Sequence, residues 1–220
     1  MNNLMNRKKI TFLKYFWIFL VCSIIGTLYE EFMHIFWYFV KHGDFNWSRR
    51  SGVFFGPINP VYGFGAVIML LVIGIKKEKN WKVFIKSFFL GGAIEFIFSF
   101  LQELISGTTS WDYSNKFLNI GGRTTIPYMF FWGLAGLLLI KWLYPFIERC
   151  LEKLPYHIYK VLSIILIILV SIDLLITWSA LLRKELRDKG IAPYTFVGEL
   201  YDEYFDDEYI KNKYPNMLDP

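Results

Sequence analysis

Long runs of apolar residues alternate with short polar connections along the chain. The runs lie at residues 10–40, 61–75, 83–105, 125–146 and 158–182. A helix needs about 20 apolar residues to cross a bilayer, and each run reaches or approaches that length. The pattern therefore predicts an all-α fold, a polytopic membrane helical bundle with about five spans.

The short stretch before the second run contains residues that end helices. It reads SGVFFGPINP and includes Gly52, Gly56, Pro57 and Pro60. Proline fixes φ and lacks a backbone donor, so a regular helix cannot continue through this stretch. Irregular backbone at membrane depth is tolerated only where it is buried in protein or lines a cavity. We therefore expect a broken-helix or re-entrant element before the second span.

Composition supports a membrane protein. Of 220 residues, 55% are hydrophobic and 20% are charged, whereas soluble domains have roughly 45–50% and about 25%. A disordered chain and a secreted soluble domain are thus excluded, and two cysteines are too few for a disulfide scaffold. The basic N-terminus resembles a signal peptide, but no small-residue cleavage site follows, so we expect an uncleaved first span.

The distribution of basic residues predicts the orientation. A net charge of +5 is ordinary for a membrane protein with basic cytoplasmic connections, so no nucleic-acid partner is expected. With the N-terminus inside, 13 Lys and Arg residues fall inside and 9 outside. Four of those 9 directly follow the last span and argue for the opposite side. We expect a multi-pass protein of the cell membrane with a cytoplasmic N-terminus, and leave the side of the tail open.

The first four spans resemble two copies of one unit, at about 10–75 and 83–146. In the first, Gly26 and Glu30 precede Trp47 and Pro60, and in the second, Gly91 and Glu95 precede Trp111 and Pro127. Both units begin on the same side, which is the arrangement of a parallel repeat with a site at the repeat interface. Residues 1–182 would thus form the transmembrane domain, with 158–182 as a fifth span outside the repeat.

Ionisable residues near or within the spans are the candidates for a substrate or ion site. A carboxylate in lipid costs about 2.5–3.5 kcal/mol, so such residues usually face the bundle interior and have a partner. The loops after the first and third spans share one side in this topology and add arginines that could bind an anionic or zwitterionic group. The candidates are Glu30, His34, Arg49, Arg50, Glu95, Asp112 and Arg123.

A structural role for these acids stays open. Glu30 and Glu95 could form ion pairs with the loop arginines and only hold helices together. For Asp173, in the last run, we expect a helix-packing hydrogen bond ahead of a functional role. The three histidines do not cluster, and no zinc-binding, P-loop or nucleophile motif occurs, so we expect no metal and no cofactor.

Residues 183–220 form a polar tail in which acids alternate with aromatic residues. Its net charge is −3, from nine acidic and six basic residues. A solvated tail with a short helix is one interpretation, and a segment that binds a partner is the other.

Several motifs resemble the bacterial integral membrane family called putative ABC-transporter type IV, or putative ABC transporter permease. They are GTLYEEF, RRSGVFFGPINPVYGFGA, GGAIEF and WDYSNKFLNIGGRTTIPYMFFWGLAGL, within about residues 26–143. Gly122-Arg123-Thr124-Thr125 is more polar than the family pattern. The matching structural positions are Gly56, Pro57, Pro60, Tyr62, Gly63, Gly65, Trp111, Tyr113, Asn119, Trp132 and Gly133.

The resemblance implies the membrane subunit of a transporter. Because the chain lacks a P-loop, ATP would be hydrolysed by a separate cytoplasmic subunit that docks on the basic connections. A membrane enzyme acting on a lipid-linked or cell-envelope substrate is an alternative, as is a scaffold subunit of a membrane complex. A homo-oligomer is compatible with each of these.

Overall fold

The computed structural model describes residues 11–48, 50–74, 78–215 and 217. The helices are α2 (Phe12–His42), α3 (Pro60–Ile73), α4 (Asn80–Ser106), α5 (Ile126–Leu138), α6 (Tyr144–Glu152), α7 (Tyr156–Asp188), α8 (Phe196–Tyr204) and α9 (Asp207–Lys213). A π-helical turn, η2 (Leu139–Leu143), joins α5 to α6. The strands β1 (Asn119–Ile120) and β2 (Thr124–Thr125) form a small antiparallel hairpin in the loop after α4.

The expected all-α membrane bundle is confirmed. Within the described residues, four helical segments are long and apolar enough to cross a membrane: Phe12–His42, Asn80–Ser106, Ile126–Glu152 and Tyr156–Asp188. The remaining predicted span corresponds to α3, which has only 14 residues. At 1.5 Å per residue it is about 21 Å long, less than the hydrocarbon thickness of about 30 Å.

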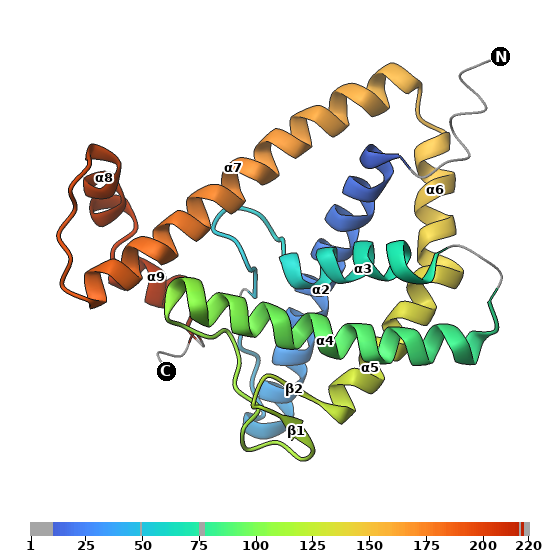
Figure 1. Ribbon diagram of the computed structural model, residues 1–220, viewed down its shortest axis with the longest axis horizontal. Helices are drawn as coiled ribbons and strands as arrows, with labels where there is room; N and C mark the ends of the chain where they lie inside the picture. The colour runs from blue at the N-terminus through green and yellow to red at the C-terminus, as the bar shows by residue number, and fades with distance from the viewer. Residues whose placement is uncertain (1–10, 49, 75–77, 216, 218–220) are drawn as a thin grey trace.

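Contacts at the helix ends show which ends lie together. The start of α2 lies beside α6, through Lys14 and Glu148 (2.5 Å), and beside the start of α7, through Trp17 and Ser163 (2.8 Å). At the opposite end, a Cβ at Gly107, after α4, would lie 1.9 Å from Glu185 Oε2 of α7. The ends of α4 and α7 therefore lie together, and in Figure 1 α3 runs back along α4 while α2 crosses them steeply.

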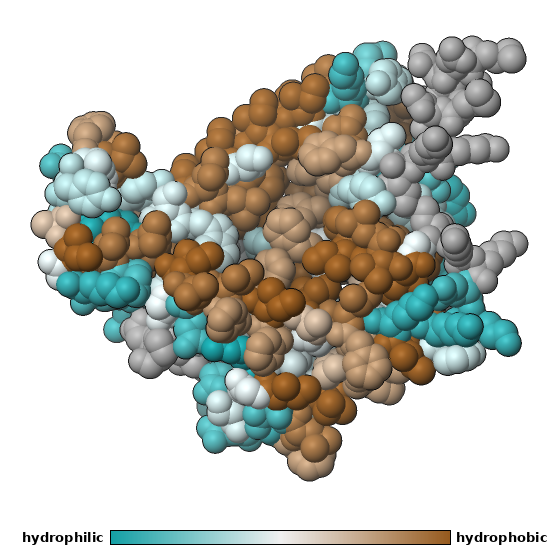
Figure 2. All heavy atoms as spheres, in the orientation of Figure 1, coloured by the Kyte–Doolittle hydropathy of each residue, from teal (hydrophilic) through white to brown (hydrophobic). Residues whose placement is uncertain are grey.

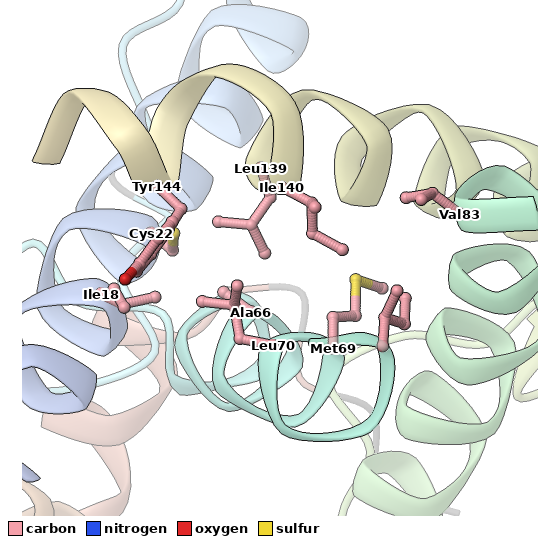
Figure 3. Packing of buried hydrophobic residues seen from close by; sticks show 10 residues of the cluster. Ile18, Cys22, Ala66, Met69, Leu70, Val83, Leu139, Ile140 and Tyr144 are labelled. Atoms are coloured by element: carbon pink, nitrogen blue, oxygen red, sulfur yellow. The ribbon is translucent and has the colours of Figure 1, made fainter. Parts of the chain in front are cut away.

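The main apolar core lies where α2, α3, α4 and the η2–α6 segment meet. Ile18, Met69, Val83 and Ile140 are all at most 4% exposed (Figure 3). Most other large apolar side chains face outward, and they cover the central part of the molecule with brown surface in Figure 2. An apolar exterior of this extent is expected where lipid replaces water around the spans.

The predicted broken element has no helix between Ser51 and Asn59. Three of its backbone amides instead donate to side chains of α7. Asp173 accepts from the amides of Phe55 (3.2 Å) and Gly56 (2.8 Å), and Thr177 Oγ1 accepts from the amide of Phe54 (3.0 Å). Asp173 therefore holds irregular backbone against the last span, in place of the helix-to-helix hydrogen bond that the sequence suggested.

The return segment of the second unit is not one continuous α-helix. The sequence predicts an uninterrupted run at 125–146, whereas α5 ends at Leu138 and the π-helical turn precedes Pro145 in α6. Proline has no amide to donate to the carbonyl four residues earlier, here Lys141, and its ring collides with that carbonyl. A π-helical turn of this kind relieves the conflict and bends the span.

Glycine–aromatic contacts occur at matching positions of the two predicted units. A Cβ on Gly26 would lie 2.3 Å from the Tyr62 ring, and a Cβ on Gly91 would lie 2.2 Å from Trp132 Cβ. Gly63 meets Phe19 and Gly133 meets Phe84 in the same way, at 2.6 Å in both cases. In each unit, therefore, the outgoing and returning helices approach too closely for any side chain larger than hydrogen.

Replacing Gly91 by alanine is expected to destabilise the protein. The new Cβ would overlap Trp132 Cβ, which cannot move without its backbone, and overpacking of this kind costs about 1–3 kcal/mol. The thermal midpoint of the purified protein in detergent should fall. Ala93→Leu, on the exposed side of the same helix, is the control and should leave the midpoint nearly unchanged; equal midpoints for both variants would contradict the packing.

Candidate functional site

A cavity of about 870 Å³ lies between the two predicted units. Side chains of α2, α3, α4, α5, η2 and α7 line it, together with the loops after α2 and α4 and residues close to α9. Most of these side chains are apolar. Among the described residues, the acids at its wall are Glu30 and Glu95, and the basic residues are Arg50 and Lys213.

Glu30 is held by two neutral donors. Asn59 Nδ2 lies 3.2 Å and the Tyr62 hydroxyl 3.0 Å from Glu30 Oε1. Asn59 is also the N-cap of α3, because its Oδ1 accepts from the amide of Val61 (3.3 Å). The residue that starts the short helix therefore also orients the carboxylate.

Glu95 is held in the same manner by the loop after α4. Thr124 Oγ1 donates to Glu95 Oε2 (2.6 Å) and the Tyr113 hydroxyl to Oε1 (3.2 Å). Burial, with the charge of Glu95 adding to it, raises the pKa of Tyr113, so the phenol stays protonated and able to donate. Thr125 caps α5 by accepting from the amide of Tyr128 (3.1 Å), which fixes the adjacent Thr124.

Neither Glu30 nor Glu95 forms an ion pair within the described part of the chain. Arg123, the expected partner of Glu95, instead pairs with Glu103 and donates to Ser99 Oγ (3.1 Å). Its guanidinium also lies over Phe100, 5.5 Å from the ring centroid. Arg123 is not among the residues that line the cavity. The structural ion pair between Glu95 and Arg123 is therefore absent.

Stacked aromatic rings line the cavity together with the two acids. Tyr62 and Trp132 occupy matching positions in the two units and stack with centroids 5.4 Å apart. Tyr113 and Tyr128 stack at 4.7 Å beside Glu95. All four rings line the cavity, so each carboxylate faces it from within an aromatic surface.

Arg50, in the loop after α2, contacts His34 on α2. Arg50 NH2 lies 2.6 Å from His34 Nδ1, and the Arg50 amide donates to Glu31 (3.3 Å). Desolvation lowers the pKa of the Arg50 guanidinium from its usual value, while the charge of Glu30 opposes that shift. Both Arg50 Nε and His34 Nε2 are buried and have no hydrogen-bond partner within the described structure.

The structure does not bring all the predicted residues to this cavity. Asp112 is exposed and accepts from the Ser114 amide (2.8 Å) and hydroxyl (2.6 Å), contacts that lower its pKa and shape the loop. Arg49 lies outside the described residues. The cavity thus contains Glu30, Arg50 and Glu95 from the predicted set, with His34 bonded to Arg50.

The predicted structural motif residues shape this region. Trp111 Nε1 donates to the Arg123 carbonyl (2.9 Å), and Asn119 Nδ2 bonds the carbonyls of Ser114 (3.0 Å) and Lys116 (3.1 Å). The other positions are spread over the broken segment and the return helices. Gly56 lies against Asp173, Pro57 is exposed, Pro60 is buried at the start of α3, Gly65 contacts Trp132, and Gly63 and Gly133 sit under phenylalanine rings.

Asn59 and Thr124, the residues that hold the two acids, were not predicted from the sequence. Asn59 is the N-cap of α3, directly before Pro60, and Thr124 precedes the N-cap of α5, three residues before Pro127. A polar residue shortly before a helix-starting proline was the signal in the sequence. Tyr128, Trp178 and Tyr214 also line the cavity without having been singled out. Within the described residues, no cluster of His, Cys, Asp or Glu could hold a metal ion.

A comparison with protein families identifies the relationship. The family described as putative ABC-transporter type IV matches residues 17–178, most of the chain. The chain belongs to this family. The matched region contains both acids of the cavity, the broken segment and Asp173, and it ends before the C-terminal helices. Neither the curated proteins nor the solved structures give a significant match to the chain.

Thr124→Val is expected to destabilise the protein. It leaves Glu95 Oε2 without its donor, and a buried polar group deprived of its partner costs about 1–3 kcal/mol. Thermal unfolding of the purified protein in detergent measures the loss. Thr109→Val, a half-buried change in the same loop, is the control; an unchanged midpoint for Thr124→Val would mean that Thr124 does not support Glu95.

Proposed function

We propose that this protein is the membrane subunit of a transporter and that the cavity between the two predicted units is its substrate site. The observation that carries the proposal is the pair of carboxylates, Glu30 and Glu95, which line one cavity and are held by neutral donors alone. Intramembrane acids are costly, and those that face a cavity usually belong to a substrate or ion pathway.

The charges and rings around the cavity favour a substrate with a positively charged group. Glu30 and Glu95 form no ion pair in the described structure, whereas the basic residues of the cavity have other contacts, Arg50 with His34 and Lys213 with the Phe54 carbonyl. Aromatic faces such as those of Tyr62 and Trp132 attract cations, by about 0.5–2 kcal/mol depending on desolvation. An organic cation with an apolar body therefore suits this cavity better than an anion does.

Matched contacts support the idea that the two units are a parallel repeat. Gly26 and Gly91 contact aromatic rings at equivalent positions, and those rings, Tyr62 and Trp132, stack on each other. Glu30 and Glu95 then occupy equivalent places on either side of the stacked pair. Substrate sites at repeat interfaces are common in transporters of this build.

Family membership and the lack of a P-loop favour a separate ATPase subunit as the partner. In our proposal the N-terminus is cytoplasmic, so the connection before α4 and the η2–α6 segment face the cytoplasm. They lie together there, because Lys141 Nζ donates to the Glu78 carbonyl (2.7 Å). This surface, with exposed Trp142 beside Lys141 and Arg149, is where we expect the ATPase to dock.

Glu30→Gln and Glu95→Gln are expected to weaken binding of an organic cation by about tenfold or more, equivalent to about 1.4 kcal/mol. Glutamine keeps the size of the side chain but removes the charge. Equilibrium binding of radiolabelled tetraphenylphosphonium to the purified protein measures the effect. The control is Glu199→Gln on α8, whose side chain is exposed and does not line the cavity. Unchanged affinity in both cavity variants would reject a cation site.

Purification of the tagged protein from its native membrane in mild detergent should recover a P-loop ATPase in stoichiometric amount. Mass spectrometry of the purified complex identifies it. Replacing Trp142 and Arg149 by alanine should reduce the amount of ATPase recovered, whereas Leu175→Ala, on the outer side of α7, should not. Recovery of the chain alone, as a monomer or homo-oligomer, would count against the ABC-type partner.

A further inference from the structure

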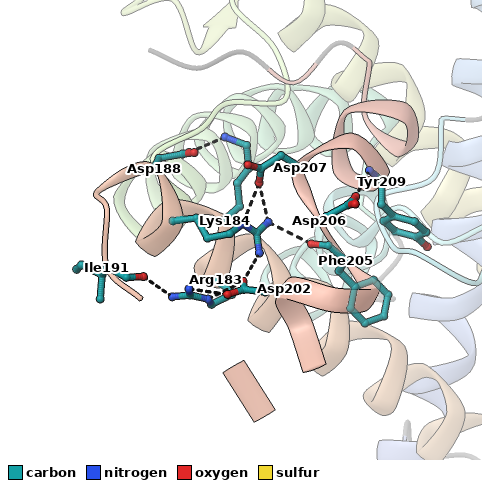
Figure 4. A network of polar contacts seen from close by, with 10 residues as sticks. Arg183, Lys184, Asp188, Ile191, Asp202, Phe205, Asp206, Asp207 and Tyr209 are labelled. Carbon is teal, nitrogen blue, oxygen red and sulfur yellow. Dashed lines mark hydrogen bonds and ion pairs between the residues drawn. The ribbon is translucent and has the colours of Figure 1, made fainter. Parts of the chain in front are cut away.

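The C-terminal helices fold back onto the last span instead of extending into solvent. Arg183 of α7 makes a bidentate pair with Asp202 of α8, at 2.8 and 2.7 Å (Figure 4). Arg187 pairs with Asp202 (2.7 Å) and with Asp207 of α9 (2.7 Å). The Arg183 guanidinium holds the pKa of Asp202 below its usual value, so Asp202 is ionised at neutral pH.

An aromatic socket in the same region receives Phe54 from the broken segment. The Phe54 side chain is only 3% exposed and lies among the rings of Phe205, Tyr209 and Tyr214, with centroid distances of 5.1, 5.2 and 5.8 Å. Lys213 Nζ at the end of α9 donates to the Phe54 carbonyl (2.5 Å). The C-terminal helices thus bind the element that precedes α3.

The last residue of α9 and the residues after it also form part of the cavity wall. Lys213, Tyr214, Pro215 and Met217 line the cavity that contains Glu30 and Glu95. Ser51 and Gly52, from the broken segment, line it as well. The Phe54 socket therefore lies at a boundary of the cavity, where the C-terminal residues meet the broken segment.

We infer that α8, α9 and the residues Tyr214, Pro215 and Met217 form a latch that closes the cavity, and that release of Phe54 from its socket opens it. The inference rests on the proposed function only in taking the cavity as the ligand site. Opening the latch leaves the broken segment in place, because Asp173 and Thr177 hold its backbone independently of the Phe54 ring.

The balance of contacts favours a latch over a permanent part of the bundle. No residue of α8 is buried, and Ile210 is the buried residue of α9. These helices are otherwise attached by partly buried aromatic rings, which pack around Phe54, Ala180 and Leu181, and by the ion-pair network, in which Asp202 is 25% and Asp207 59% exposed. An exposed ion pair such as that of Asp207 is weak, and segments with few fully buried residues open at lower free energy than the core.

A native cysteine reports on the state of the cavity. Cys22 on α2 is buried and lines the cavity, whereas Cys150 is exposed. In a Cys150→Ser background, the rate at which a maleimide modifies Cys22 measures access. The double variant Asp202→Asn/Asp207→Asn removes the acids of the network, and deletion of residues 192–220 removes the latch itself.

Both changes should speed Cys22 modification by about fivefold or more, since several weak ion pairs lost together change the closed population by that factor. Asp188→Asn is the matched control, because Asp188 pairs with Lys184 within α7 (2.6 Å) and takes no part in the latch. It should leave the rate unchanged. An unchanged rate in the deletion variant would overturn the inference.

A general loosening of the bundle would also expose Cys22, so a second reporter is needed. Val83→Cys in a background without native cysteines places a thiol in the core, where Val83 is 0% exposed and does not line the cavity. Under the inference its modification stays slow when the latch is removed. An equal acceleration at both positions would show that the C-terminal helices only support the fold. Neither readout depends on transport, so a failure of the proposed function would not alter them.

Discussion

The arrangement depends on one constraint, that backbone polar groups at membrane depth must find partners within the protein. The carboxylate of Asp173 satisfies it by accepting from the amides of Phe55 and Gly56 in the broken segment. Because that segment is pinned to α7, the chain can enter the bundle without forming a helix and begin α3 only at Pro60. The same placement brings Asn59 to Glu30 and Phe54 to the C-terminal helices. A buried charge thus serves to position irregular chain.

Charged side chains occur in two kinds of environment in this protein. The arginines pair where a carboxylate can reach them, as Arg123 does with Glu103 and Arg183 with Asp202. Glu30 and Glu95 receive only hydroxyl and amide donors in the described structure. Such donors orient a carboxylate without supplying a countercharge, which leaves that role to a ligand. A bundle held together by these acids would instead show them in closed ion pairs, since a buried charge without compensation is destabilising.

The sequence was informative where a run of apolar residues, or the free-energy cost of placing one charged residue in lipid, decides the structure. Apolar runs predicted the bundle, and the expense of an acid in lipid singled out Glu30 and Glu95. It was less informative where the decisive partner lies far along the chain. Thr124 reaches Glu95 across 29 positions, and Phe54 reaches Thr177 across 123. No local sequence pattern indicates either contact. Pro145 was readable as a helix breaker, yet the long apolar run around it concealed the π-helical turn.

The basic residues that follow the last span lie in a network of ion pairs. Arg183, Lys184, Arg187 and Lys189 favour a cytoplasmic end, against the cytoplasmic N-terminus that the other basic residues favour. In the structure each one has an acidic partner: Asp202, Asp188, Asp207 and Glu185. The orientation bias depends on Lys and Arg and little on nearby acids, so these ion pairs do not remove the conflict. Asp202 and Asp207, which pair with α7, alternate along the tail with the aromatic residues that surround Phe54. One short, alternating sequence therefore both balances the charge of the last span and closes the cavity beside it.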